Sequence, residues 1–152
     1  MRIRLFFFLS LVLLIFAGCA KKKAEKQAEE DDRLIQKYLQ DNNLTAIKTE
    51  SGLYYIIDVQ GTGLGCNENS DVRVAYTGYF LNNEIFDQSD SQGIAFNLQG
   101  VIRGWTEGIP YFREGGSGKL LIPSALAYGI SGSGSVPANT VILFDVELLE
   151  VL

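Results

Sequence analysis

Histidine is absent from this chain of 152 residues, and the sequence holds only two cysteines, three prolines and one tryptophan. Without histidine there is no imidazole to act as a general base, as a metal ligand or as part of a catalytic triad. The cysteines, Cys19 and Cys66, are too few for a tetrahedral cysteine-rich zinc site. If the chain is an enzyme, its chemistry needs neither a strong nucleophile nor a transition metal, and we expect no metal and no cofactor.

Positive charge is also in short supply. The formal net charge is −5 and the isoelectric point is about 4.7. An acidic chain repels phosphate backbones, so nucleic acid is excluded as an expected partner. The hydrophobic fraction of 47% and the length are typical of one globular domain with appendages.

The N-terminus has the layout of a secretory signal. In MRIRLFFFLSLVLLIFAGC, Arg2 and Arg4 precede an apolar run over 5–16, and small residues then lead to Cys19. This ending resembles a bacterial lipobox, in which the cysteine is acylated and becomes the new N-terminus. We therefore predict a lipoprotein signal peptide over 1–18 and a protein held at a bilayer of a bacterial cell envelope by acylated Cys19, on the periplasmic or outer-membrane face. An uncleaved membrane anchor is the alternative.

Residues 19–50 are expected to connect this anchor to a folded domain. The segment AKKKAEKQAEEDD is charged and low in apolar residues, which is typical of a solvated tether. RLIQKYLQDNNL follows with helical spacing of its apolar residues, Leu34, Ile35, Tyr38 and Leu39. We interpret it as a short amphipathic spacer helix, with a dimerisation helix as the alternative.

From Ser51 to Leu152 the pattern indicates one α+β domain. Apolar residues alternate with polar ones between glycine- and asparagine-rich turns, which predicts strands within 52–60, 71–81, 84–87, 118–124 and 140–152. In VIRGWTEGIPYF the spacing of Val101, Trp105 and Ile109 is helical instead, and Gly104 and Gly108 predict that this helix is short. A twisted antiparallel sheet wrapped around one short helix is the expected architecture.

Two motifs that could carry other chemistry are weak. SGSGS at 131–135 lacks the Gly-Lys-Ser/Thr ending of a phosphate loop and is followed by Val-Pro. Asp87 and Asp90 lie in a polar loop without an aromatic sugar platform, which does not support a glycosidase pair. The same acids lack the spacing of a calcium loop.

Aromatic residues are the remaining signal. Several come from different elements and can face one space between sheet and helix: Tyr76, Phe86, Phe96, Trp105, Tyr128 and Phe144. In a small β-rich domain such residues usually form the core. Whether Trp105 only fills that core or also floors a binding pocket decides the functional interpretation.

Four stretches in order resemble the FKBP-type peptidyl-prolyl cis/trans isomerases: VAYTGYFLNNEIFDQS, FNLQGVIRGWTEG, KLLIPSALAYG and VPANTVILFDVELLEV. The resemblance covers the whole of 51–152. It implies the family fold, a twisted antiparallel sheet around a short helix, and isomerisation of X-Pro bonds without covalent chemistry. It also implies that Trp105 is the floor of a proline pocket.

The same resemblance assigns residues to the site. It implies catalytic roles for Asp87, Phe96, Trp105 and Tyr128. It implies substrate-binding roles for Tyr76, Phe86, Val101, Ile102, Val136 and Phe144, with the backbone N–H of Ile102 holding a substrate carbonyl. The loop DQSDSQGIA is shorter than in many members, and the Ser/Gly-rich stretch after Tyr128 leaves Val136 as the apolar residue expected over the pocket.

The implied partners are proline-containing polypeptides in the course of folding, among them exported proteins. Macrolide inhibitors are possible ligands, and the lipid bilayer is a partner through Cys19. A non-catalytic chaperone or assembly module that binds proline in the same pocket is the alternative function.

Overall fold

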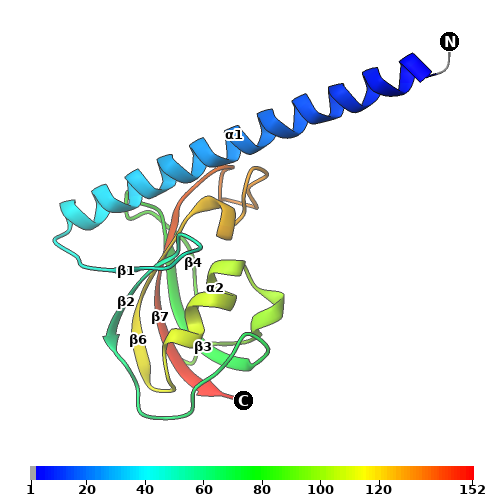
Figure 1. The fold of residues 1–152 in the computed structure, drawn as a ribbon. Coiled ribbons are helices and arrows are strands. Elements are labelled where there is room, and N and C mark those ends of the chain that lie inside the picture. The colour runs from blue at the N-terminus through cyan, green and yellow to red at the C-terminus, as the bar shows by residue number, and fades with distance from the viewer. Residues whose placement is uncertain (1–2) are drawn as a thin grey trace.

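The computed structural model describes residues 3–152, with side chains from residue 21 onward. It shows a curved antiparallel sheet with a short helix on one face and a long helix across one end of the other (Figure 1). The helices are α1 (Ile3–Asp41) and α2 (Arg103–Gly108), and the single-turn 3₁₀ helices are η1 (Leu98–Gly100), η2 (Ile109–Tyr111) and η3 (Ser124–Leu126). The strands are β1 (Ile47–Lys48), β2 (Tyr54–Val59), β3 (Asp71–Tyr79), β4 (Ile85–Gln88), β5 (Ile94–Asn97), β6 (Gly116–Ile122) and β7 (Ile142–Val151). The predicted α+β class is confirmed.

The sheet has the strand order β1-β2-β6-β7-β3-β4, and β5 also pairs with β3. Two short strands share one edge of the long strand β3, because β4 pairs with residues 77–79 and β5 with residues 71–74. The sequence did not predict β1 or β5. Both are too short to show an alternating pattern, and their pairing depends on the length of the neighbouring strand.

The inner face of the sheet forms the main core with α2. On β7 the buried residues Ile142, Phe144, Val146 and Leu148 alternate toward this face. Gly104 and Gly108 allow α2 to lie close against β6. A Cβ on Gly104 would stand 2.5 Å from Cγ2 of Ile122, and one on Gly108 would stand 2.7 Å from Cδ2 of Leu120.

The outer face is apolar only where α1 covers it. Leu121 and Leu143, which point away from α2, pack with Ile35 and Leu39 of α1 in a second cluster. Farther along β7 the outer face is polar, with Asp145 and Glu147. The helix therefore closes a second, smaller core on the back of the sheet.

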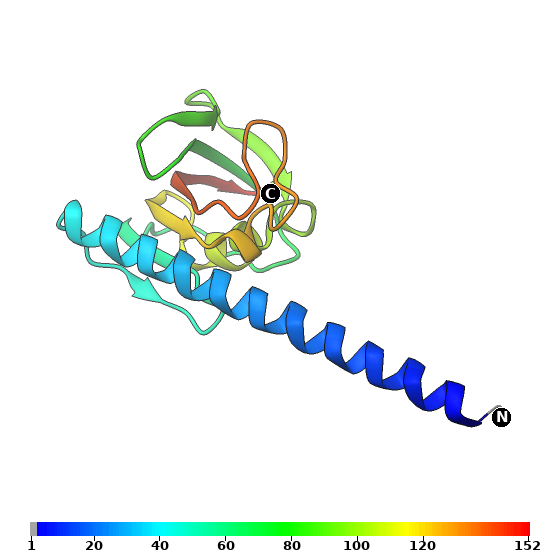
Figure 2. The ribbon, with the colours of Figure 1, turned by 90° about the horizontal axis from the view of Figure 1, so that it is seen from above.

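The tether expected within 19–50 differs from the structure. α1 runs unbroken through the charged segment, and Asp31, expected to be solvated, is fully buried. The apolar stripe of Ile35 and Leu39 is buried against the sheet of the same chain, so these two residues are not free to face a second helix. Figure 2 shows the N-terminal part of α1 projecting away from the sheet.

The predicted signal peptide and the acylation of Cys19 lie outside what the structure describes, since residues 1–2 are not described and side chains begin at residue 21. Within the part of the chain whose side chains are described, no helix is long and apolar enough to cross a membrane.

Candidate active site

A cavity of about 460 Å³ opens on the inner face of the sheet, beside α2. Residues of β3, β4, β5, η1, α2 and β7 form its wall, together with residues that follow η1 and η3. Nine residues line it: Tyr76, Asp87, Phe96, Gly100, Val101, Ile102, Trp105, Tyr128 and Phe144. The structure thus brings together eight of the ten pocket residues that the sequence predicted.

Trp105 is both core and pocket lining. Its side chain is only 3% exposed. Three rings meet it nearly edge to face, with centroids 5.1 Å away for Tyr76, 5.4 Å for Phe96 and 5.2 Å for Phe144. Edge-to-face pairs of this kind contribute about 0.5–1.5 kcal/mol each beyond their buried area, so the floor is stiff.

The indole Nε1–H of Trp105 is buried, and among the described residues it has no hydrogen-bond partner. An unpaired buried donor costs about 1–3 kcal/mol. At this position the packing of the aromatic rings takes precedence over a protein hydrogen-bond partner for the indole.

Helix α2 places Trp105 through its first turn. Ile102 stands before the helix in extended backbone, and its carbonyl accepts the N–H of Trp105 at 2.9 Å. The Oγ1–H of Thr106 donates to the Leu98 carbonyl at 2.6 Å, which ties α2 to η1. The N–H of Ile102 precedes the helix, so the intrahelical bonding pattern does not use it.

Two phenols and one carboxylate form the polar rim. The Tyr76 hydroxyl donates to Oδ2 of Asp87 at 2.9 Å. Burial, reinforced by this bond and by the charge of Asp87, raises the pKa of Tyr76 to about 12. Burial and the charge of Asp87 also raise the pKa of Tyr128. Both hydroxyls therefore remain neutral donors at physiological pH.

Two predicted residues do not line the cavity. Phe86 packs behind the wall, its ring centroid 5.6 Å from that of Phe144 and 5.0 Å from that of Phe80. Val136, expected over the pocket, is 5% exposed and belongs to the main core. The chain turns back at Ser133–Val136 by a backbone pair, which carries Val136 inward.

Gly100 lines the cavity, but sequence reasoning missed it. It contributes backbone alone from the end of η1, and no atom lies within 4 Å of where its Cβ would stand. Because glycine has no side chain, nothing in the sequence indicates that this position lines a pocket.

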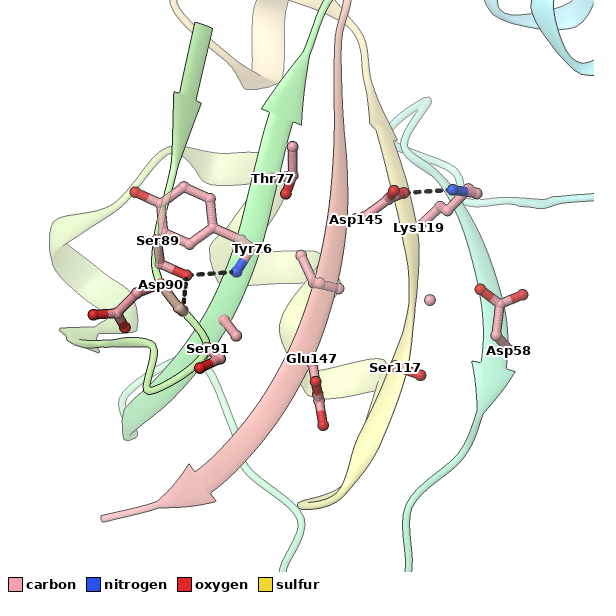
Figure 3. Close-up of a pocket in the computed structure, with 13 residues that line it drawn as sticks. Asp58, Tyr76, Thr77, Ser89, Asp90, Ser91, Ser117, Lys119, Asp145 and Glu147 are labelled. Atoms are coloured by element: carbon pink, nitrogen blue, oxygen red, sulfur yellow. Dashed lines mark hydrogen bonds and ion pairs between the residues drawn. The ribbon is translucent and has the colours of Figure 1, made fainter. Parts of the chain in front are cut away.

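A second hollow, of about 420 Å³, lies on the outer face and is shown in Figure 3. Its side chains are mainly acids and hydroxyls, and its Lys119 is paired with Asp145. In the described part of the chain no group of acidic or cysteine side chains is arranged to hold a metal ion. The aromatic cavity is therefore the better candidate site.

The outer hollow nevertheless contains a contact that supports the site. Oγ of Ser89 accepts the backbone N–H of Tyr76 at 2.9 Å and donates to the Asp90 carbonyl at 2.8 Å (Figure 3). The turn between β4 and β5 is thereby fixed to β3. This turn separates Asp87 from Phe96, so its anchorage helps to set the width of the pocket.

Comparison with known proteins gives one consistent result. Residues 65–149 match the model of the family described as FKBP-type peptidyl-prolyl cis-trans isomerase. The chain is 43% identical over 135 residues to the isomerase FkpA of Aeromonas hydrophila, covering 86% of this chain and 50% of that one. It spans about half the length of the curated relatives it matches.

Solved structures agree. The crystal structure of FkpA from Escherichia coli is similar with a TM-score of 0.72 at 32% identity, covering 94% of this chain and 71% of that one. A peptidyl-prolyl cis-trans isomerase from Pseudomonas syringae is similar with a TM-score of 0.70 at 29% identity, covering 84% of this chain and 94% of the other.

Proposed function

Because this chain belongs to the FKBP-type peptidyl-prolyl cis-trans isomerase family, we propose that its aromatic cavity accelerates the cis/trans isomerisation of X-Pro bonds in polypeptides. One observation carries the proposal. A tryptophan packed nearly perpendicular to three aromatic rings lines a cavity whose rim offers neutral phenols and a carboxylate. This is an apolar seat for a pyrrolidine ring beside a few polar groups that can orient the peptide.

The reaction suits what the sequence lacks. Rotation about a peptide bond has a barrier of roughly 20 kcal/mol, and X-Pro bonds isomerise in tens of seconds. No bond is made or broken, so no nucleophile, imidazole or metal is required. As the amide twists it loses conjugation and its charge separation falls, so a dry apolar pocket favours the twisted form over the planar one.

Each polar group has a role in this scheme. The backbone N–H of Ile102 binds a substrate carbonyl, and the Tyr128 hydroxyl donates to a second carbonyl at the rim. Asp87, oriented by the hydroxyl of Tyr76 at 2.9 Å, faces the twisting amide. Phe96, Val101 and Phe144 enclose the ring above Trp105.

The proposal extends to location and clients. The relatives named FkpA come from bacteria. The N-terminal lipobox pattern supports acylation of Cys19 and a position at a membrane of the cell envelope. There the clients are exported polypeptides that fold after crossing the inner membrane, and macrolides that mimic a prolyl peptide are ligands of the same pocket.

The test is an isomerisation assay on an X-Pro tetrapeptide with the full chain purified in mild detergent. Asp87→Ala and Tyr128→Phe should each lower kcat/KM several-fold, since each removes a hydrogen bond or charge of about 1 kcal/mol at a partly wet rim. Asp58→Ala, an exposed carboxylate at the outer hollow, is the matched control and should leave kcat/KM within about twofold.

Two outcomes would decide against the enzyme. A folded chain that gives no acceleration on any X-Pro peptide, yet binds proline ligands, would establish the non-catalytic binding module instead. Equal losses in Asp87→Ala and Asp58→Ala would show that the cavity is not where the reaction takes place.

A further inference from the structure

We propose that Asp31 of α1 is a positioning residue for Tyr128, so that the helix leading to the N-terminus helps to set the activity of the pocket. The inference rests on the proposed isomerase function. Asp31 does not touch the cavity; it acts through Ser124 at the start of η3.

Asp31 is a fully buried carboxylate with three donors. Its Oδ2 accepts the backbone N–H of Ser124 at 2.8 Å and the hydroxyl of the same residue at 2.6 Å. Its Oδ1 accepts Nε2 of Gln27, one helical turn earlier, at 2.7 Å. A buried charge is tolerated only when it is bonded in this way, and such charge-assisted bonds are among the stronger ones in proteins.

Ser124 connects Asp31 to the two residues on either side of Tyr128. Its carbonyl accepts the N–H of Ala127 at 3.1 Å and that of Gly129 at 2.8 Å. Ser124 thus uses both of its donors on α1 and its carbonyl on the turn that carries Tyr128. Pro123, the residue before η3, has no side-chain hydrogen-bonding group with which to cap it.

A second set of hydrogen bonds connects α1 to the same turn. Nε2 of Gln27, which is bonded to Asp31, also reaches the carbonyl of Asn139 at 3.5 Å. The N–H of Asn139 donates to the Gly129 carbonyl at 2.8 Å. Both peptide groups of Gly129 are therefore connected to one turn of α1, and Tyr128 directly precedes this doubly held residue.

The adjacent acid supplies a matched control. Asp32 accepts the hydroxyl of Tyr54 at 2.7 Å and pairs with Lys48, which attaches α1 to β2 and β1 rather than to η3. Asp31 and Asp32 thus hold the same helix to the same domain at two places, and only Asp31 is connected to the Tyr128 turn. A purely structural role predicts that Asp31→Ala lowers stability and leaves kcat per folded molecule unchanged, as in Asp32→Ala, whereas a positioning role predicts a loss of kcat in Asp31→Ala alone.

The experiment compares Asp31→Ala and Asp32→Ala in the full chain purified in detergent, with kcat and KM measured separately. Because Asp31 acts through Tyr128, its removal should cost no more than removal of the Tyr128 hydroxyl. Asp31→Ala should therefore lower kcat several-fold, at most as much as Tyr128→Phe, with KM within about twofold. Asp32→Ala should leave both within about twofold.

Amide hydrogen exchange at Ala127 and Gly129 measures the same coupling without any activity. Exchange there should accelerate in Asp31→Ala and not in Asp32→Ala. This readout separates the two proposals, because a wild-type chain without isomerase activity ends the proposed function while the exchange result still reports on Asp31.

The inference is overturned if Asp31→Ala is folded, keeps the wild-type kcat and leaves Gly129 exchange unchanged, or if the two variants change all quantities alike. Should Asp31→Ala not fold, Asp31→Asn is compared with Asp32→Asn by the same criteria. Asparagine keeps the size of the side chain and one acceptor oxygen, so the expected loss in kcat for Asp31→Asn is about threefold. Equal kcat values for Asp31→Asn and Asp32→Asn decide against the proposal.

Discussion

At the scale of single residues, Trp105 belongs both to the core and to the lining of the cavity. It is 3% exposed and yet forms the floor of the cavity. Composition alone favours the core for such a residue, and the resemblance to the family predicted that Trp105 is also the floor of a pocket. The geometry shows both, since Trp105 packs nearly perpendicular to three rings of the core and also lines the cavity.

A substitution at this floor should separate the two roles. Trp105→Ala risks about 3–5 kcal/mol of unfolding free energy, whereas Trp105→Leu fills more of the space and should cost less. Trp105→Leu should weaken binding of a prolyl ligand at least tenfold by calorimetry, because the flat floor is lost. Phe112→Leu, equally buried but outside the cavity, is the control: it should lower stability and leave ligand affinity unchanged.

The rim has a defined pH behaviour. No histidine is present, so no ordinary side-chain pKa within the pocket falls between about 5 and 8. For an uncharged X-Pro peptide, kcat/KM should be flat from about pH 6 to about pH 9. A clear titration in that range, measured in buffers of constant ionic strength, would contradict the roles assigned to Tyr76 and Tyr128.

Tyr76 should also affect stability at alkaline pH. Its folded-state pKa of about 12 lies above the ordinary phenol value of about 10. The contribution of Tyr76 to the free energy of unfolding is therefore complete below pH 10 and is lost as the pH rises through 12, because the phenol loses its proton at lower pH in the unfolded chain than in the folded one. The gap in unfolding free energy between wild type and Tyr76→Phe should shrink from pH 9 to pH 11 in urea titrations; a constant gap would refute the shift.

At the scale of elements, the position of the short helix α2 depends on its two glycines, which allow it to lie close to β6. The sequence correctly predicted a short helix, but Gly104 and Gly108 were interpreted only as residues that weaken this helix. The structure adds the reason for their presence, since a Cβ at either position would overlap side chains of β6.

Gly104→Ala should therefore destabilise the domain, although alanine is the better helix former. Intrinsic propensity favours alanine by about 1 kcal/mol, but overpacking against Ile122 costs about 1–3 kcal/mol. We expect a net loss in the free energy of unfolding measured in urea. Gly100→Ala, where nothing lies within 4 Å of the added Cβ, is the control and should change stability little.

The long strands were predictable because alternation over many residues is a strong signal, and β3 and β7 were both recognised. The docking of α1 was not predicted, although part of the signal was present. Leu143 lies on the same face of β7 as Asp145 and Glu147, and a buried residue on a polar face requires a cover. The burial of Asp31 could not be foreseen, because its partner Ser124 is 93 positions away.

For the site, the resemblance predicted most of the residues that line the cavity. It also assigned Phe86 and Val136, which lie outside this lining because Phe86 packs against Phe144 and Val136 belongs to the main core. Gly100 was missed because its contribution is backbone alone.

At the scale of the whole molecule, the chain is a small sheet domain with a helix that is packed on its back and projects beyond it (Figures 1 and 2). The cavity opens on the opposite face, which leaves it accessible while α1 extends toward the N-terminus. An anchor at Cys19 would thus hold the domain near a membrane without covering the pocket.

The anchor itself is testable. Cys19→Ser should remove acylation, and the protein should move from the detergent phase to the aqueous phase or accumulate unprocessed. Cys66→Ser is the matched control, since that thiol lies in the domain and burial raises its pKa, which makes it unreactive. Unchanged mass and unchanged partitioning of Cys19→Ser would rule out lipidation.

The most direct test of the central claim is exchange NMR on an X-Pro peptide that populates both cis and trans forms. With the full chain present at a small fraction of the peptide concentration, exchange cross-peaks between the two forms should appear within a mixing time of about one second, compared with tens of seconds for the uncatalysed peptide. They should disappear when a macrolide occupies the cavity. Peptide signals that shift on binding, with cis and trans forms still not exchanging, would contradict the account.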